Sequence, residues 1–325
     1  MTAMAKQTGL PPKEARAEQR RMRRKQLLRD IHHYRMLYPL LLFGLAFFVV
    51  FHYAPMYGIQ LAFKRYSIGK GIAGSDWVGL ANFAKLFARA EFWNAFRNTI
   101  VISLLKTVIA FPIPILLAIL INEIKRRRLA RGLQVFFTLP HFLSWVTISG
   151  IMLNLLGSGG AINSLLVSLG GEKVSFLSNG DVFRGLLVFT DIWKESGWSS
   201  IIYMAAIASI DQSQYESATI DGANRLQKAW YITWPSLKSV AAVLLLLQLG
   251  HAMSGNFDQV FNLYNPTVYK KAEIIDTYVY NITFLQAADY GLSTAVGLFK
   301  GVINCALLLA ANFVVSKLNA DAKIL

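Results

Sequence analysis

Long runs without a charged residue constrain this chain more than any other feature. Met36–Tyr53, Leu133–Leu156 and Val240–Phe257 contain no Asp, Glu, Lys or Arg. A helix that crosses the hydrocarbon core of a bilayer needs about 20 mainly apolar residues. A soluble core does not need apolar runs of this length. The runs therefore predict an all-α integral membrane protein.

Three further apolar segments carry a few charges and bring the predicted number of transmembrane helices to about six. They are Asn98–Ile121, Gly185–Ile210 and Leu292–Ser316. Pro112 and Pro114 are expected to kink the first of these helices, because proline removes a backbone hydrogen bond. The sequence thus predicts one transmembrane domain over residues 36–325, preceded by a basic cytoplasmic segment over residues 1–35.

Lysine and arginine in short flanking segments indicate the orientation of the helices. Residues 1–35 hold ten of them against three acidic residues, and five more lie in residues 125–131. One predicted helical hairpin separates the two segments, so both are expected in the cytoplasm. By helix count, residues 211–238 and the C-terminus fall on the same side. Residues 54–97 and 258–290 fall on the other side.

The net charge of +15 makes nucleic acid a partner to consider. However, the basic residues flank apolar runs, which is typical of contact with anionic lipid headgroups, and nucleic acid is not expected as a partner. Within the N-terminal segment, residues 14–34 lack Pro and Gly and can form an interfacial helix, although a solvated basic tail fits equally. The one cysteine, Cys305, excludes an internal disulfide.

Residues 212–235, between the fourth and fifth predicted helices, have an unusual composition for a loop. Glu216–Ile220 is expected to begin a short helix with an acidic first turn. Gly222, followed by the small Ala223, permits a tight bend. Leu226–Ile232 predicts a second short helix. Two short helices around a glycine would form a compact projection that moves as a rigid body.

The spacing in this segment resembles the coupling motif of binding-protein-dependent ABC importer permeases. That motif reads E-A-A, two residues, D-G-A, and later Ile-x-Leu-Pro. The matching residues are Glu216, Ala218, Asp221, Gly222, Ala223, Ile232 and Pro235. Ser217 and Trp234 depart from the motif, and Trp230 stands next to the position where the family has an aromatic residue. The chain is therefore identified as resembling the type I, MetI-like permeases of bacterial inner membranes.

The resemblance implies a role for the segment and a set of partners. In the family the motif forms a coupling helix that sits in a cleft of a separate ATPase subunit. This places Gly222 at the bend and Glu216 and Asp221 in polar contacts near the docking surface. The implied partners are a second permease subunit in a heterodimer, two ATPase subunits, an extracytoplasmic solute-binding protein, an oligosaccharide and membrane lipid.

Three other segments resemble the subgroup of permeases that import fragments of complex polysaccharides. They are Phe137–Trp145, Asp191–Ser200 and Asn256–Phe261. The subgroup includes permeases for alginate oligosaccharides, and pectin-fragment permeases have very similar sequences. An acidic, alginate-type saccharide is thus the expected cargo, with pectin-derived and neutral oligosaccharides as alternatives. An ion-coupled secondary transporter is the alternative from another class.

The sequence contains no motif for chemistry of its own. A G-x-x-x-x-G-K-[ST] phosphate loop is absent, so ATP and Mg²⁺ are expected on the partner ATPase and no cofactor on this chain. No nucleophile elbow or zinc-protease motif occurs, so no catalytic residue is predicted. The histidines show no metal spacing beyond the adjacent pair His32 and His33, so no metal site is predicted.

Ionisable residues inside spans are costly in a membrane and are candidates for function. Asp191 shares a helix face with Lys194 and Glu195, and tryptophans nearby offer aromatic surfaces for sugars. A structural ion pair is the alternative interpretation of this cluster. Two lysines in other spans could offset the carboxylates of a uronate. The candidates for the transport path are Lys106, Asp191, Trp193, Lys194, Glu195, Trp198 and Lys300.

Overall fold

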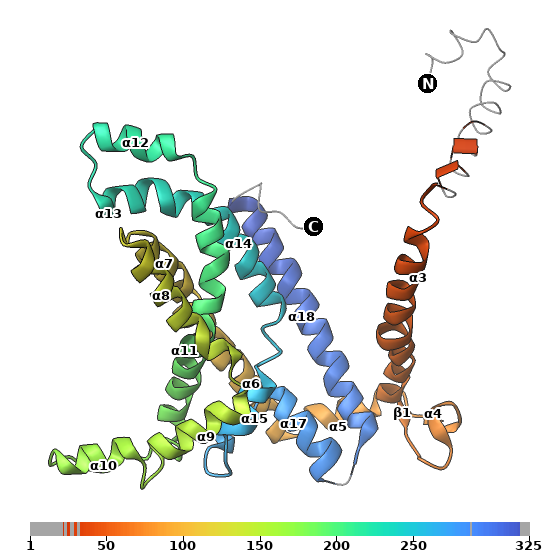
Figure 1. Ribbon diagram of the computed structural model, residues 1–325. Coiled ribbons are helices and arrows are strands. Elements are labelled where there is room, and N and C mark those ends of the chain that lie inside the picture. Colours follow the sequence, from red (N-terminus) through yellow and green to blue (C-terminus); the bar gives the residue numbers. More distant parts are fainter. Residues whose placement is uncertain (1–21, 23–24, 27–28, 31–32, 287, 319–325) are drawn as a thin grey trace. The chain divides into compact units, whose positions relative to one another are not determined.

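The computed structural model describes residues 33–286 and 288–318, together with residues 22, 25–26 and 29–30 (Figure 1). The chain divides into two compact units, one ending at Gln60 and the other beginning at Leu61. Most of the basic segment 1–35 lies outside the described residues. The interfacial helix and the solvated tail therefore both stay predictions.

One long helical run makes up most of the described first unit and ends at Phe63, just inside the second. It consists of α3 (Leu37–Phe48), a π-helical turn (Val49–Tyr53) and a 3₁₀ segment (Ala54–Phe63). The helical run extends beyond the uncharged segment Met36–Tyr53, because Pro55 lies in the first turn of the 3₁₀ segment, where a missing N–H costs nothing. Apolar side chains such as Phe43 (78% exposed) are open on its surface. Such a surface requires lipid or another chain to cover it.

The second unit is built almost entirely of helices. Its one small sheet pairs β1 (Lys64–Arg65) antiparallel with β2 (Asp76–Trp77). The helices are α4 (Gly71–Gly74), α5 (Ala81–Phe87), α6 (Ala90–Leu105), α7 (Pro112–Asn122), α8 (Arg127–Thr138), α9 (Trp145–Leu156), α10 (Ala161–Ser168), α11 (Gly180–Ala208), α12 (Gln212–Ile220), α13 (Arg225–Lys228), α14 (Trp234–Gly250), α15 (Phe257–Leu263), α16 (Tyr269–Ala272), α17 (Ile275–Tyr280) and α18 (Tyr290–Leu318).

Within the second unit, the connecting elements gather at two ends. Figure 1 shows α12, α13 and the turn between α7 and α8 at one end, while α5, α9, α10, α15 and α17 lie at the other. Helices α7, α8, α11, α14 and α18 run between the two ends. This arrangement confirms the predicted grouping of residues 125–131 with residues 211–238.

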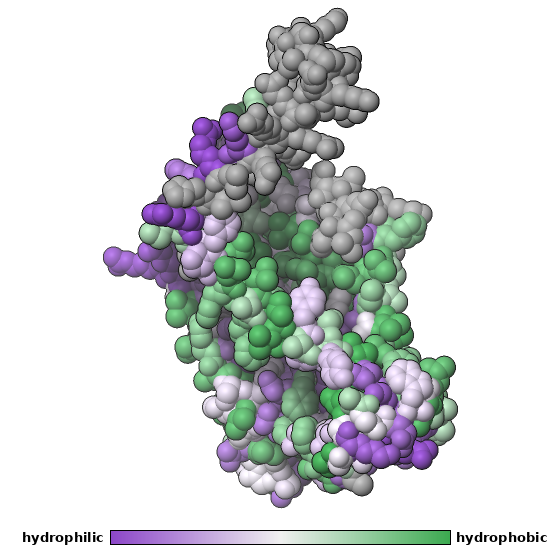
Figure 2. All heavy atoms as spheres, turned by 90° about the vertical axis from the view of Figure 1, so that its right-hand side faces the viewer, coloured by the Kyte–Doolittle hydropathy of each residue, from purple (hydrophilic) through white to green (hydrophobic). Residues whose placement is uncertain are grey.

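Five helical runs of described residues are long and apolar enough to cross a membrane. They are Leu37–Phe63, Ala90–Asn122, Trp145–Ser168, Arg225–Gly250 and Tyr290–Phe313. Helix α11 is not among them, although it has 29 residues. Asp191, Lys194 and Glu195 interrupt its apolar sequence. Apolar side chains are exposed on several of these runs, and Figure 2 shows hydrophobic residues over much of one face.

The third predicted helix, Leu133–Leu156, is wrong as a continuous element. Helix α8 passes into a 3₁₀ turn (Leu139–Phe142), and the chain then becomes extended at Leu143 and Ser144. The Ser144 hydroxyl accepts a hydrogen bond from the Thr147 N–H at 3.1 Å and caps α9. The break separates two helices that hydropathy alone cannot distinguish.

The second predicted helix starts earlier than expected and deforms where its prolines predict. Between α6 and α7 lies a π-helical turn, Lys106–Ala110, in which the Phe111 N–H donates to the Lys106 carbonyl at 3.1 Å. The widened turn comes directly before Pro112, which cannot donate to a carbonyl one turn back. The predicted kink is thus a π-bulge that begins at Lys106.

Helices α8 and α11 pack very closely at one glycine. A Cβ atom on Gly197 would lie 2.0 Å from the Phe137 carbonyl oxygen. Only glycine lets the two backbones approach this far. The contact fixes α8 against the part of α11 that carries the charged residues.

Candidate functional site

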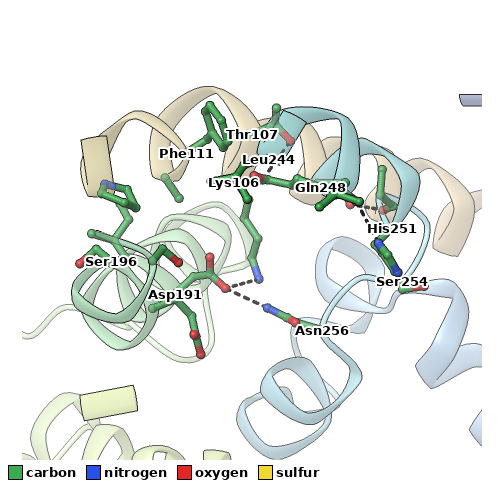
Figure 3. Close-up of a pocket in the computed structure, with 18 of the residues that line it drawn as sticks. Lys106, Thr107, Phe111, Asp191, Ser196, Leu244, Gln248, His251, Ser254 and Asn256 are labelled. Atoms are coloured by element: carbon green, nitrogen blue, oxygen red, sulfur yellow. Dashed lines mark hydrogen bonds and ion pairs between the residues drawn. The ribbon is translucent and has the colours of Figure 1, made fainter. Parts of the chain in front are cut away.

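A polar pocket of about 450 Å³ opens between α6, α11, α14 and the loop that follows α14. The side chains nearest its centre come from the π-bulge after α6, from the middle of α11 and from residues 248–256 (Figure 3). The volume is within the range of about 300–1,000 Å³ that small-molecule sites occupy. The pocket combines apolar walls with a few charged and amide groups.

An ion pair and hydrogen bonds with two side-chain amides form the polar wall of the pocket. Lys106 Nζ lies 2.9 Å from Asp191 Oδ1, and the Asn256 amide donates to the same oxygen at 2.8 Å. Figure 3 shows Lys106 and Asn256 both pointing toward Asp191. The Lys106 ammonium also donates to Gln259 Oε1 at 2.5 Å. The lysine charge is therefore already compensated from two sides.

The buried Gln259 holds this arrangement in place. Its amide nitrogen donates to the Leu187 carbonyl at 2.7 Å and to the Thr190 hydroxyl at 2.8 Å. Both groups belong to α11, where Leu187 lies one turn before Asp191 and Thr190 directly precedes it. Gln259 thus connects α15 to α11 and presents its oxygen to Lys106.

Asn256 has an uncommon backbone conformation. Its φ of 57° lies in the left-handed region, and it is the one non-glycine residue with a positive φ among the described residues. Such conformations cost energy and persist where surrounding contacts determine them. Here the contact is the hydrogen bond to Asp191, at the point where the loop after α14 enters α15.

Glu195 lies on the pocket wall but does not pair with Lys106. Its Oε2 atom lies 2.8 Å from Nδ1 of His141, and the His141 ring stacks on Trp198 at a centroid distance of 4.5 Å. His141 belongs to the 3₁₀ turn after α8. Glu195 therefore connects the pocket to the break between α8 and α9.

Lys194 has a different position from the one expected. The predicted face shared with Asp191 does not produce an ion pair, since Asp191 pairs with Lys106 instead. The buried Lys194 ammonium donates to the carbonyls of His141 and Leu143 at 2.5 and 2.9 Å. These carbonyls lie at the helix break and would otherwise lack a donor. Lys194 stabilises the break rather than lining the pocket.

Of the seven predicted path residues, Lys106, Asp191 and Glu195 line the pocket. Trp193, Lys194, Trp198 and Lys300 are not among its lining residues. Lys300 pairs with Asp276 at 2.5 Å. Their role in transport stays a prediction. The sequence reasoning missed Gln248, Asn256, Gln259 and His141. The signal for Gln248 was an amide inside an uncharged apolar run.

The segment between α11 and α14 forms two short helices around a glycine, as its composition predicts. Gly222 has a φ of 78°, and the helices α12 and α13 lie on either side of it. Asn224 and Gln227 form a reciprocal capping box at the start of α13, with bonds of 2.7 and 2.9 Å. Local hydrogen bonds thus define the turn.

Two side-chain contacts connect the helices of this segment. Lys228 Nζ donates to the Thr219 hydroxyl at 2.7 Å, and the Tyr215 and Thr233 hydroxyls lie 2.8 Å apart. At the start of α12, the backbone and side-chain hydrogen bonds from Ser213 hold the pKa of Asp211 below its usual value. These hydrogen bonds hold α12 and α13 together, as expected of a rigid projection. We name the two helices and their turn the tied segment.

The surface of this segment is open and partly apolar. Ile220, Leu226, Trp230 and Tyr231 are all exposed, and so are the carboxylates Glu216 and Asp221. Ala218, Ala223 and Ile232 are half-buried and Pro235 is exposed. Within the described residues, no group of three or more His, Cys, Asp or Glu side chains could hold a metal ion.

The chain has clear relatives among known proteins. The model of the family described as binding-protein-dependent transport system inner membrane component matches residues 110–319. The polygalacturonan/rhamnogalacturonan transport system permease protein YteP of Bacillus subtilis (strain 168) is 43% identical over 300 residues, which cover 92% of this chain and 93% of that protein.

Solved structures agree with this relationship. A bacterial ABC transporter involved in the import of the acidic polysaccharide alginate contains a chain with a TM-score of 0.84 and 37% identity, covering 90% of this chain and 99% of that one. A bacterial alginate ABC transporter in complex with an alginate pentasaccharide-bound periplasmic protein gives a TM-score of 0.82 at 38% identity, covering 90% and 98%. The chain is therefore an all-α, multi-pass membrane protein that belongs to the family of inner membrane components of binding-protein-dependent transport systems, with the fold of a type I, MetI-like ABC importer permease.

Proposed function

We propose that this chain is the permease subunit through which an ABC importer takes up acidic oligosaccharides derived from polyuronates. The observation that carries the proposal is the 43% identity to a polygalacturonan/rhamnogalacturonan permease across nearly the whole chain. The likeness to an alginate importer agrees with it, because both polymers consist largely of uronate units. A lactose permease is only 28% identical over 67% of the chain, so a neutral cargo has less support.

The polar pocket is the proposed part of the transport path. Its amide and carboxylate groups can hydrogen-bond to sugar hydroxyls, and its apolar walls can contact sugar rings. Lys106 is compensated by Asp191 and Gln259, so a uronate carboxylate would have to exchange with Asp191 to reach it. Such an exchange would also release Asn256 and the loop after α14.

The tied segment α12–α13 is the proposed contact with the ATPase. Its exposed residues Leu226, Trp230 and Tyr231 offer an apolar surface beside the carboxylates Glu216 and Asp221. This chain then supplies no catalytic residue, and ATP and Mg²⁺ bind the partner subunit. The end of the second unit that carries α12 and α13 faces the cytoplasm in this proposal, as do both chain termini.

The complete importer in this proposal contains one further permease subunit, two ATPase subunits and an extracytoplasmic solute-binding protein. The last partner is supported by the alginate transporter that was solved with its periplasmic protein. The exposed apolar surfaces of the five candidate membrane helices leave area for lipid and for a second permease.

The test is ATP hydrolysis by the assembled importer in proteoliposomes with its binding protein. We expect trigalacturonate or trimannuronate to stimulate hydrolysis several-fold and neutral maltotriose to leave it at the basal rate. Stimulation by maltotriose alone would contradict the acidic cargo. Failure of the chain to assemble with any ATPase subunit would contradict the permease assignment itself.

A further inference from the structure

A second cavity, of about 680 Å³, lies at the end of the second unit opposite α12 and α13. We name it the basic cavity. Its walls come from β1, from α5 and from the start of α18. Residues of 64–89 meet residues of 282–286 and 288–291 there, although the two regions are far apart in sequence. In the proposed orientation this end faces away from the cytoplasm.

The charge of the basic cavity is one-sided. Among its described lining residues, Lys64, Arg65, Lys85 and Arg89 are basic, and Asp289 alone is acidic. In the polar pocket, by contrast, Lys106 is paired with Asp191, and Glu195 lies against His141. Positive charge in excess is therefore a property of the basic cavity and not of the proposed transport path.

Two of the four basic side chains already bind other groups of the protein. The Lys64 ammonium is buried and donates to the Ile72 carbonyl at 2.8 Å and to the Ala73 carbonyl at 3.3 Å. Lys85 forms an ion pair with Asp289. Neither Arg65 nor Arg89 forms an ion pair within the described part of the chain. Both guanidinium groups lie at the cavity outside these ion pairs, and Arg89 also interacts with the Tyr278 side chain and with the charge of Asp289.

The walls around these arginines are fixed by close contacts. The Asn82 amide donates to the Ala62 and Lys64 carbonyls at 2.9 and 3.0 Å, and a Cβ on Gly291 would lie 2.8 Å from the same amide nitrogen. Tyr66 and Tyr290 meet edge to face at 5.4 Å on the cavity wall. The cavity thus combines preformed walls, aromatic rings and two guanidinium groups that form no ion pair within the described residues.

We propose that the basic cavity binds a uronate unit of the acidic oligosaccharide, with Arg65 and Arg89 holding its carboxylate and the Tyr66–Tyr290 pair contacting the sugar ring. Guanidinium groups bind carboxylates through paired N–H···O bonds, and aromatic rings suit sugar faces. A concave site of this volume fits a sugar unit better than it fits the flat contact of a protein partner. This inference rests on the acidic cargo of the proposed function.

The experiment measures the concentration of oligosaccharide that half-saturates ATP hydrolysis by the assembled importer with its binding protein. The variants are Arg65→Gln, Arg89→Gln and the double variant, in vesicles of phosphatidylcholine. For trigalacturonate we expect each single variant to raise this concentration about three- to tenfold. For the methyl ester of trigalacturonate, which carries no charge, we expect no change.

Lys70→Gln is the matched control, because Lys70 belongs to the same segment, pairs with Asp76 and does not line the cavity. Equal losses for the charged cargo and its ester would overturn the inference and indicate a docking surface for the binding protein. Losses that appear only when anionic lipid is added would also overturn it and indicate a lipid headgroup. No loss at all would overturn the inference alone, whereas a wild-type importer that neither trigalacturonate nor trimannuronate stimulates would overturn the proposed function with it.

Discussion

At the residue scale, the Lys106–Asp191 pair decides the character of the polar pocket. Both side chains are largely buried, with 10% and 15% of their surface exposed. A buried ion pair is weak evidence for stability, but removal of one partner leaves an uncompensated charge. Removal of one partner is therefore expected to lower the free energy of unfolding strongly. Replacement of both partners by apolar residues is expected to lower it little.

Asp191→Ala should lower the free energy of unfolding by about 3–5 kcal/mol, because Lys106 then keeps its charge with only Gln259 as a partner. The double variant Lys106→Met/Asp191→Leu should lose less. Thermal unfolding of the purified complex in detergent measures both. A double variant that is less stable than Asp191→Ala would contradict the role of the unpaired charge.

Gly197 supports the packing of α8 on α11. Gly197→Ala puts a Cβ atom 2.0 Å from the Phe137 carbonyl oxygen, and the backbones must separate, at a cost of about 1–3 kcal/mol or more. Gly185→Ala is the control in the same helix, because nothing lies within 4 Å of its added Cβ. That variant should be neutral or slightly stabilising. Similar melting temperatures for the two variants would contradict the close approach.

The partners of single residues were the least predictable part of the site. The sequence marks Asp191, Lys194 and Glu195 as unusual charges in an apolar helix. It does not show that Asp191 finds its cation 85 residues earlier, in another helix. A spacing of three or four residues predicts contacts within one helix, but it does not predict contacts between helices. Lys194 turns toward the break after α8, which hydropathy does not reveal.

At the element scale, three prolines share one local structure. Pro55, Pro112 and Pro235 each follow a π-helical turn that ends two residues earlier. In each case the residue before the proline donates to a carbonyl five positions back. The wider turn accommodates the proline ring and its missing N–H without ending the helix. This is why long helical runs persist through prolines here.

Pro112→Ala should remove the reason for the π-bulge at Lys106–Ala110. A regular α-helix has one residue fewer in that turn, which rotates Lys106 by about 100° relative to α7 and weakens its bond to Asp191. The rate of uptake should fall below that of the wild type, to the rate of a Lys106→Ala variant, which lacks the same bond. Pro55→Ala has the same local pattern outside the polar pocket and is the control. Wild-type uptake by Pro112→Ala would contradict the positioning role of the bulge.

Gly222 sets the turn between α12 and α13 through its backbone and not through lack of space. Nothing lies within 4 Å of an added Cβ, but φ is 78°. Gly222→Val should therefore distort the turn and uncouple ATP hydrolysis from uptake, and Gly222→Asp should do so less strongly. Asn tolerates left-handed backbone, so Gly222→Asn should keep most coupling. An uncoupled Gly222→Asn with a normal Gly222→Val would contradict this reading of the turn.

Elements were predictable where periodicity or turn residues mark them. The two helices around Gly222 followed from an acidic first turn, the glycine and a short stretch with apolar residues, and α18 followed from one long apolar run. The break at Leu143–Ser144 did not follow, because one capping serine hardly changes the average hydropathy. The signal that could have marked it is Pro140 followed by Ser144-x-x-Thr147.

At the scale of the whole molecule, the proposed ATPase contact and the proposed cargo sites lie in different parts of the second unit. In the second unit, the tied segment α12–α13 lies at one end and the basic cavity at the other. The polar pocket lies on the helices that run between them. Helix α11 connects the polar pocket with α12, since it carries Asp191 and Glu195 and is the element before α12.

The most direct test of this account is uptake of labelled trigalacturonate into proteoliposomes that hold the assembled importer. The account predicts uptake that requires both internal ATP and the binding protein, and that stops with Gly222→Val although the subunits remain assembled. Uptake at an undiminished rate without ATP, driven by a proton or sodium gradient, would contradict it.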